Sequence, residues 1–462
     1  MDYSSSSAAW AQLEFGSVKL HDGRYAKRLV KIGEQLAATP SGTLPAAFPT
    51  WAELKGAYRF FSDPRNSFEQ IQSVHRQRVL QQCCQPGEYL LIEDTTKLDF
   101  TCRECEDMGF TDIGGRGFFL HTTLALRVEA WDLNQRPEAV VLGLLNQQRT
   151  NRARLVGKKN QTRRQMRERQ RESDRWAKTL LELPCAGNTT ERQWIWIADR
   201  EADFYEPIQR CLSSGVDFVI RAFHKRRLAE GSEYYFDSLA QAPVAGTMAV
   251  DLRARPGAAA RTAVLEVRWQ AVQLRGPYRK GQRMEPLAVN AIEVRESSPP
   301  AGVEPLRWVL LTTLRCERWP ELQRIIGRYA ARWWVEEYHK ALKSGAGAEQ
   351  SQLEQQSRIE SLIAVLAVVA VRLLNLKFLA RAKPDETVDQ TIFGKEVLAV
   401  LEQRIGKPPA QTWTNRQLVR AIAKLGGFIG RTGDGEPGWQ NIWRGWQRLM
   451  WMIEGAELMQ PH

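Results

Sequence analysis

Residues 89–96 read Tyr-Leu-Leu-Ile-Glu-Asp-Thr-Thr, a short apolar run that ends in charged and hydroxyl-bearing side chains. An uninterrupted apolar run of this length is typical of a strand that is buried on both faces. A second run, Trp-Ile-Trp-Ile-Ala at 194–198, is followed directly by another aspartate. The sequence therefore predicts two buried strands that end at Asp94 and Asp199.

Strand patterns surround these two runs. Residues 118–128 and 139–145 are rich in apolar and β-favouring side chains and flank a turn at 134–137, so we expect three successive antiparallel strands. Residues 202–212 have helical spacing, and residues 216–222 return to a strand pattern. The predicted core is therefore of the α/β class, in the order βββ, helix, βαβ.

The second half of the chain changes character twice. Short strands separated by Pro and Gly, such as 263–269 and 288–294, predict a β-rich insertion over about 224–313, with 308–313 as its last strand. Helices are expected from Pro320 onward. The part after about 383 is a separate helical region with five tryptophans, namely Trp413, Trp439, Trp443, Trp446 and Trp451.

The N-terminal part is predicted to be a small helical module. Within residues 8–80, apolar positions recur at helical spacing over 26–36 and 51–61. Its basic side chains either face phosphates or form ordinary solvated helix surface; they are Arg24, Lys27, Arg28, Lys31, Lys55 and Arg59. The expected domains are 1–75, 76–382 and 383–462.

The charge balance points to a polyanionic partner. The 462 residues include 65 Lys and Arg against 53 Asp and Glu, which gives 65 − 53 = +12 and a pI near 9.4. Basic residues spread through mixed-charge segments favour nucleic acid over a membrane, although charge that serves solubility is the plain alternative. Residues 151–175 hold ten Arg and Lys against three acidic residues and indicate either a DNA-facing arm or a solvated loop.

Other bulk features indicate an intracellular protein. The longest apolar run, 362–371, ends at Arg372 and is too short to span a bilayer, so we expect a buried core helix. Seven cysteines without a secretion signal predict reduced thiols, no disulfide framework and a cytoplasmic location.

An aspartate at the end of a buried strand is costly unless it is paired or binds a metal. Carboxylates are the preferred ligands of Mg²⁺, and two of them from neighbouring strands, with a third from a helix, can hold two ions about 4 Å apart. A helix cap or turn role is the competing interpretation for each aspartate alone.

Residues 329–343, Tyr-Ala-Ala-Arg-Trp-Trp-Val-Glu-Glu-Tyr-His-Lys-Ala-Leu-Lys, supply the third carboxylate. At 100° per residue, one helix stripe combines Glu336 with four other side chains, namely Tyr329, Arg332, Lys340 and Lys343. Glu337 lies a quarter turn away, so Glu336 is the candidate ligand. A salt-bridged exposed helix is the alternative, weakened by the neighbouring aromatic residues.

These strings resemble a family, the DDE transposases of insertion-sequence family four, in the branch of the transposon five type. The family signature Y-x2-R-x3-E-x6-K is met by Tyr329, Arg332, Glu336 and Lys343. Asp94-Thr-Thr and the string Asp199-Arg-Glu-Ala-Asp203 match the family's two aspartate motifs. Near the N-terminus, the strings at 24–30, which include Arg24 and Arg28, and at 56–60 resemble the family's DNA-end-binding module.

The resemblance implies a ribonuclease-H-like catalytic core with a β-rich insertion, flanked by an N-terminal DNA-end-binding domain and a C-terminal dimerisation domain. It implies a catalytic and metal-binding triad of Asp94, Asp199 and Glu336, holding two Mg²⁺ ions for which Mn²⁺ substitutes. DNA would be contacted by Arg221, Trp308, Tyr329, Arg332, Trp333, Lys340, Lys343, Arg24 and Arg28. The implied partners are transposon ends, target DNA and a second copy of the chain.

The implied reaction is cut-and-paste transposition. Water nicks the transposon end, the freed 3′-hydroxyl forms a hairpin, water reopens it, and the end joins target DNA. Two alternatives stay open: a ribonuclease-H-like nuclease that cuts without joining, and an inactive DNA-binding or inhibitory relative. Tyr329 is also conceivable as a nucleophile, although its place beside the carboxylate favours phosphate binding.

Overall fold

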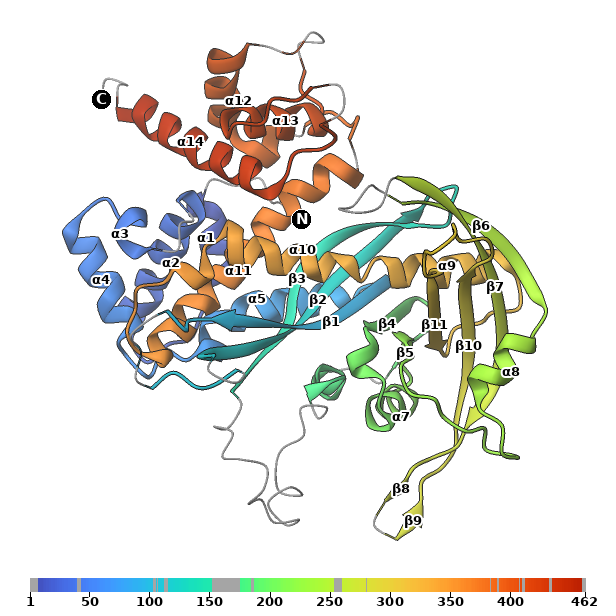
Figure 1. The fold of residues 1–462 in the computed structure, drawn as a ribbon. Helices are drawn as coiled ribbons and strands as arrows, with labels where there is room; N and C mark the ends of the chain where they lie inside the picture. Colours follow the sequence, from blue (N-terminus) through green and yellow to red (C-terminus); the bar gives the residue numbers. More distant parts are fainter. Residues whose placement is uncertain are drawn as a thin grey trace.

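The protein is described from a computed structural model, which covers residues 7–458 except 40–42, 103–104, 106, 112–114, 152–174, 184–186, 253–259, 280, 383, 389, 407, 409–411 and 432–433. Within these residues, the chain forms one large mixed sheet with helices on both faces and a helical region at each end (Figure 1). The basic stretch noted at 151–175 falls almost wholly outside the described residues.

The sheet has nine strands in the order β3-β2-β1-β4-β5-β11-β10-β7-β6. The pairs β1–β4 and β4–β5 are parallel and the other neighbours antiparallel. The bounds are β1 Gly87–Asp99, β2 Gly117–Trp131, β3 Pro137–Thr150, β4 Arg192–Ala198, β5 Asp217–Arg221, β6 Val244–Leu252, β7 Arg261–Leu274, β10 Leu287–Glu296 and β11 Arg307–Thr312. The three expected antiparallel strands and the later βαβ unit are confirmed, whereas the helix expected between them starts in residues outside the described ones, and the described part before β4 contains a 3₁₀ helix, Lys178–Glu182.

The β-rich insertion is part of the same sheet. Its last strand, β11, pairs with β10 on one side and with core strand β5 on the other. A short hairpin, β8 Tyr278–Arg279 and β9 Gln282–Arg283, projects from it, and a helix that the sequence did not predict, α8 Tyr235–Gln241, precedes β6. The predicted fold class, a ribonuclease-H-like core with a β-rich insertion and flanking helices, is confirmed.

Alternate residues of the central strands enter two hydrophobic cores. Leu90 and Ile92 join the core that contains the long helix α11 Gln356–Ala382, whereas Tyr89 and Leu91 join the core that contains α7 Tyr205–Ser214. Because both faces are covered, the strand carries a continuous apolar run instead of an alternating one. The α11 face also receives the helices α5 Phe68–Cys83, α9 Trp319–Ala330 and α10 Trp333–Lys340.

Helix α11 is a core helix. Its segment Gln356–Phe378 is long and apolar enough to cross a membrane, but 94% of the most apolar window is buried inside the protein. It packs against α5, β3 and α13. The run 362–371 is therefore the buried core helix that the sequence predicted.

Helical regions lie at both ends of the chain. The N-terminal one contains α1 Ser7–Phe15, α2 Gly23–Ala38, α3 Leu44–Ala47 and α4 Trp51–Phe61; the C-terminal one contains α12 Gln390–Ile405, α13 Asn415–Leu425 and α14 Trp439–Leu458. Both lie away from hairpin β8–β9 (Figure 1). The six described cysteines are free thiols, namely Cys83, Cys84, Cys102, Cys105, Cys211 and Cys316.

Two predicted helices differ in detail. The segment 202–212 becomes a 3₁₀ turn, Arg200–Ala202, followed by α7 from Tyr205, because Asp203 turns inward to bind another loop. The continuous helix predicted over 329–343 is wrong: α9 ends at Ala330, α10 begins at Trp333, and Ala341–Gly345 is a π-helix. At the break, the backbone N–H groups of Arg332, Trp334 and Val335 bond three residues back instead of four.

Candidate active site

Parallel pairing of β1 and β4 brings Asp94 and Asp199 to the same edge of the sheet. Ile92 pairs with Ile197, and each aspartate comes two residues after its isoleucine, so the two aspartates lie level with each other. Ile92 and Ile197 both belong to the α11-side core, and side chains two residues apart share a face. Both carboxylates therefore belong to the face that α10 covers.

Arg332 connects the strand carboxylate to the helix carboxylate. Its Nη1 donates to Oδ2 of Asp94 at 3.2 Å, and its Nη2 donates to Oε1 of Glu336. The backbone N–H of Thr95 donates to the other oxygen of Asp94 at 2.8 Å. One guanidinium thus lies between two acidic groups from distant parts of the chain.

The three acidic groups feel one another electrostatically. The pKa of Asp94 is raised to about 7, chiefly by burial and also by the negative charges of Asp199 and Glu336, while Arg332 and the Thr95 N–H act in the opposite direction. Asp94 is thus half-ionised near neutral pH. A cation that enters the site would favour the ionised form of this carboxylate.

Asp199 caps a short helix in addition to acting electrostatically on Asp94. Its Oδ1 accepts from the backbone N–H of Glu201 at 2.7 Å, which caps the 3₁₀ turn Arg200–Ala202. This is the capping contact that the sequence left open as the alternative for a strand-end aspartate. The cap uses Oδ1, and the charge of Asp199 still acts on Asp94.

The donor chemistry of this cluster suits Mg²⁺. Asp94, Asp199 and Glu336 offer carboxylate oxygens from three elements on one face, and the ion prefers such ligands. In the part of the chain that the structure describes, no group of three or more His, Cys, Asp or Glu side chains is close enough to hold an ion. The guanidinium of Arg332 lies between Asp94 and Glu336 and supplies positive charge there.

An aromatic pair and a second arginine border the cluster. The rings of Trp308 and Tyr329 meet edge to face with centroids 5.3 Å apart. Burial raises the pKa of Tyr329, while Arg332 and Arg221 lower it and Asp199 raises it, so these groups lie near one another. Arg221 ends β5 and donates to the carbonyl of Arg307 at 3.4 Å.

Three candidates from the same motif lie elsewhere. The Nζ of Lys340 lies over the ring of Trp333, 4.4 Å from its centroid, and 3.3 Å from Oε1 of Glu337. Lys343, in the π-helix, is 3.6 Å from Glu349. The π-helix takes Lys343 off the stripe that a continuous helix would have formed, whereas Lys340 stays one regular turn from Glu336 and contacts Glu337 and Trp333.

Glu337 forms a buried ion-pair cluster that joins α10 to the C-terminal region. Its carboxylate binds Nζ of Lys377 on α11 and accepts from Nε1 of Trp439 on α14 at 2.8 Å. Trp333 donates to the other oxygen at 3.2 Å. These contacts, of which Lys377 is the strongest, hold the pKa of Glu337 at about 2.

A buried network lies behind Asp94, and the sequence reasoning missed it. Glu93 accepts from the Thr123 hydroxyl at 3.0 Å and from the Ala177 backbone N–H at 2.8 Å, and it lies 3.4 Å from Nε2 of His121. The other ring nitrogen of His121 contacts the Thr95 hydroxyl at 2.9 Å. A glutamate inside an apolar strand run was the signal that could have revealed it.

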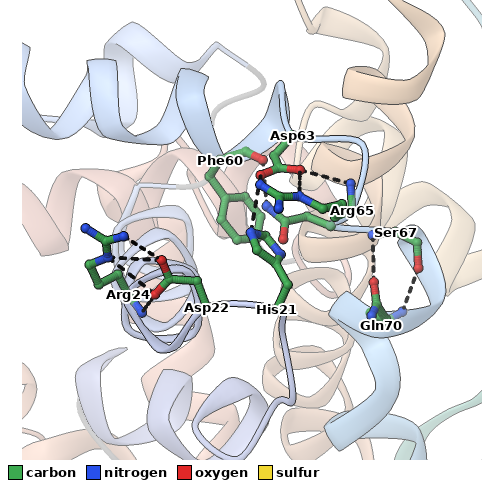
Figure 2. A network of polar contacts seen from close by, with 9 residues as sticks. His21, Asp22, Arg24, Phe60, Asp63, Arg65, Ser67 and Gln70 are labelled. Atoms are coloured by element: carbon green, nitrogen blue, oxygen red, sulfur yellow. Dashed lines mark hydrogen bonds and ion pairs between the residues drawn. The ribbon is translucent and has the colours of Figure 1, made fainter.

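The basic candidates of the N-terminal module lie on its first helices. The guanidinium of Arg24 binds the carboxylate of Asp22, the N-cap of α2, with Nη2 at 2.8 Å, and its own side chain is 90% exposed (Figure 2). Nearby, Asp63 binds Arg65 and lies 3.4 Å from His21 (Figure 2). Arg28 packs against Gly56, where an added Cβ would meet the guanidinium carbon at 2.6 Å.

Comparisons with known proteins match both ends of the chain. Residues 7–66 match the family model described as Transposase DNA-binding. Residues 368–461 match the model described as Transposase Tn5 dimerisation domain. These matches support a transposase of the Tn5 type that binds DNA and forms homodimers. The candidate active site lies between the two matched segments.

Proposed function

We propose that this chain is a DDE transposase of insertion-sequence family four that catalyses cut-and-paste transposition. The observation that supports the proposal is the placement of Asp94 and Asp199 on one face of the sheet, with Glu336 linked to Asp94 through Arg332, in the part of the sequence between a DNA-binding and a dimerisation module. In the proposed reaction, water nicks the transposon end and the freed 3′-hydroxyl attacks the opposite strand. Water then opens the hairpin, and the 3′-end joins target DNA.

The three carboxylates are proposed to hold two Mg²⁺ ions, with Mn²⁺ as a substitute, which would activate the attacking oxygen and stabilise the leaving one. The chain's own part begins with Asp94, whose pKa of about 7 lets it lose its proton readily near neutral pH. Arg332 would then move from the carboxylates to a DNA phosphate, which a guanidinium binds through two parallel hydrogen bonds.

The bordering residues would position the DNA. Arg221 and Tyr329 lie beside the cluster and would hold phosphate oxygens next to the reacting group. Tyr329 is 6% exposed and burial raises its pKa, so its hydroxyl stays protonated and suits hydrogen bonding better than nucleophilic attack. Trp308 would stack an extruded base of the hairpin, which contributes about 1–3 kcal/mol.

Outside the cluster, Lys340, Lys343 and Trp333 are proposed to contact DNA farther along its path, and Arg24 and Arg28 to contact the transposon end. Lys340 and Trp333 are about half exposed, as such contacts require. The partners are the terminal inverted repeats, target DNA and a second subunit, which in the family cuts the paired end in trans.

The test is a product assay. The full-length chain is incubated with paired ends of its own element, target plasmid and Mg²⁺, and the nicked, hairpin and joined products are separated by size. All three should form with the wild-type chain and be absent with Asp94→Ala. Cleavage without joining would instead identify a nuclease, and end cleavage that survives Asp94→Ala would refute the active site.

A further inference from the structure

A cavity of about 510 Å³ lies between segments that follow β4, β5 and β7. Its walls come from three segments: residues 203–206 after the Asp199 turn, residues 224–227 after β5, and residues 275–283 around hairpin β8–β9. Two of these segments directly continue the strand ends that carry Asp199 and Arg221. The lining includes none of the candidate active-site residues, and the register puts the end of β7 level with the start of β5, away from the strand ends that carry Asp199 and Arg221.

Hydrogen bonds between the three segments hold the cavity in shape. The buried carboxylate of Asp203 accepts from the backbone N–H groups of Phe223 and His224 at 2.7 Å each. The N–H of Arg275 donates to the carbonyl of Arg227 at 2.9 Å, and the Tyr205 hydroxyl donates to the carbonyl of Glu285 at 3.0 Å. A ligand would meet preformed walls, which lowers the entropic cost of binding.

The lining is strongly positive. Five arginines, Arg226, Arg227, Arg275, Arg279 and Arg283, face two acidic residues, Asp203 and Glu206, so the lining carries 5 − 2 = +3 charges with His224 neutral. Arg226 is neutralised by Asp203 at 2.5 Å, and Arg279 meets Glu206 at 3.2 Å in an exposed pair. The remaining excess charge belongs to the other three arginines.

Two of these arginines are oriented by neutral acceptors. Nη2 of Arg275 donates to the carbonyl of Gly231 at 2.7 Å, and Nη1 of Arg283 donates to the carbonyl of Gly276 at 3.2 Å. A carbonyl fixes the direction of a guanidinium without cancelling its charge, so the remaining donors suit an anion. Gly276 itself is required by close packing, because an added Cβ would lie 2.1 Å from the carbonyl oxygen of Met284.

We propose that this cavity binds phosphates of the DNA backbone away from the phosphate that reacts, with Arg275 and Arg283 as the principal ligands. The proposal rests on the proposed function for its DNA substrate. Two sources present the same phosphodiester chemistry, the transposon end with its flank and the target duplex, and the experiment separates them.

The experiment measures binding in the presence of a chelator, so that it does not depend on catalysis. Full-length Arg275→Gln/Arg283→Gln is compared with the wild-type chain by fluorescence anisotropy on two labelled probes, a random-sequence duplex and a duplex carrying the element's own terminal repeat. Arg127→Gln/Arg315→Gln serves as the control, since it removes the same charge from two exposed arginines outside the cavity. A lysine pair, Arg275→Lys/Arg283→Lys, retains the charge.

The cavity variant should lose about tenfold in affinity, and the slope of log affinity against log salt should fall by about 2, one unit for each lost phosphate contact. A loss on the random duplex alone assigns the cavity to target DNA, and a loss on the repeat alone assigns it to the transposon end. The lysine pair should recover most of the affinity at low salt. The proposal is overturned if the cavity variant matches the control on both probes, or if the lysine pair loses as much affinity as the glutamine pair. Binding that behaves as expected while the wild-type chain fails to cleave ends would refute the proposed function alone.

Discussion

Glu336 and Glu337 are neighbours in the chain, yet Glu336 binds Arg332 at the candidate active site and Glu337 binds Lys377 and Trp439 in the C-terminal region. We therefore expect Glu336 to act in catalysis and Glu337 to hold the C-terminal region in place, although both lie in the same turn of α10. Glu336→Gln should abolish end cleavage and leave the thermal midpoint within about 1 °C of the wild type, because this half-buried side chain can still accept a hydrogen bond as an amide and Arg332 keeps its contact with Asp94.

The matched variant, Glu337→Gln, should do the reverse. It leaves the buried Lys377 without its charged partner, a loss that costs about 3–5 kcal/mol when one member of a buried pair is removed. The thermal midpoint and the dimer content, measured by scanning calorimetry and sedimentation, should both fall. If the two glutamine variants behave alike, the division of roles between these carboxylates is wrong.

The pKa of Asp94 predicts a pH-dependent effect on stability. Burial is the main cause that raises this pKa to about 7, well above the usual range of an aspartate, so the folded state binds a proton that the unfolded state releases. This stabilisation is complete below about pH 4 and is lost as pH rises through 7. Asp94→Asn, which cannot ionise, should therefore have a midpoint about 1–4 °C above wild type at pH 8 and equal to it at pH 4. A variant midpoint below that of wild type at pH 8 would contradict the raised pKa.

Metal binding should follow the same ionisation. An ion must displace the proton of Asp94, so affinity for Mn²⁺, measured by electron paramagnetic resonance of the free ion, should rise between pH 6 and 8 by up to about tenfold per unit below pH 7. Asp94→Asn should bind more weakly and lose this slope. An affinity that is flat in pH for the wild-type chain would remove Asp94 from the ligand set.

Glu93 is expected to hold β1 in position through its buried contacts with Thr123 and Ala177. Glu93→Ala removes a carboxylate that accepts two hydrogen bonds and leaves His121, Thr123 and the Ala177 N–H without it. Such a loss costs about 1–3 kcal/mol for each buried polar group left unpaired. The thermal midpoint should fall, whereas Asp99→Asn, at the exposed end of the same strand, should change it little. An unchanged midpoint in Glu93→Ala would exclude this anchoring role.

The sequence predicted the strands that end near Asp94 and Asp199, because buried strands are recognised from their apolar runs. It could not predict the break at Arg332 or the π-helix at Ala341–Gly345, since helical spacing alone assumes regular geometry. The π-helix therefore moves Lys343 off the predicted stripe, while Lys340 remains within the regular helix α10. Helix α8 was missed for a related reason: seven residues between strand-rich segments carry little periodic signal.

Tertiary pairing also lies beyond a single sequence. The ion pair between Glu337 and Lys377 joins residues forty positions apart, and the bond from Ala177 to Glu93 spans eighty-four. Within its own segment, none of these residues has a sequence feature that identifies its partner. The Glu93 network was hidden for the same reason, although a charged residue within a buried run is a usable warning.

The ladder that continues from β5 through β11 into β10 has a consequence for engineering and evolution. Excising the insertion would strip β5 of its neighbour and leave Val219, Ile220 and Arg221 on a bare margin, where another chain could dock and seed aggregates. The insertion therefore cannot be removed without exposing an edge of the core sheet. Insertions and deletions among related chains should occur in hairpin loops such as β8–β9, far from the strands that carry the aspartates.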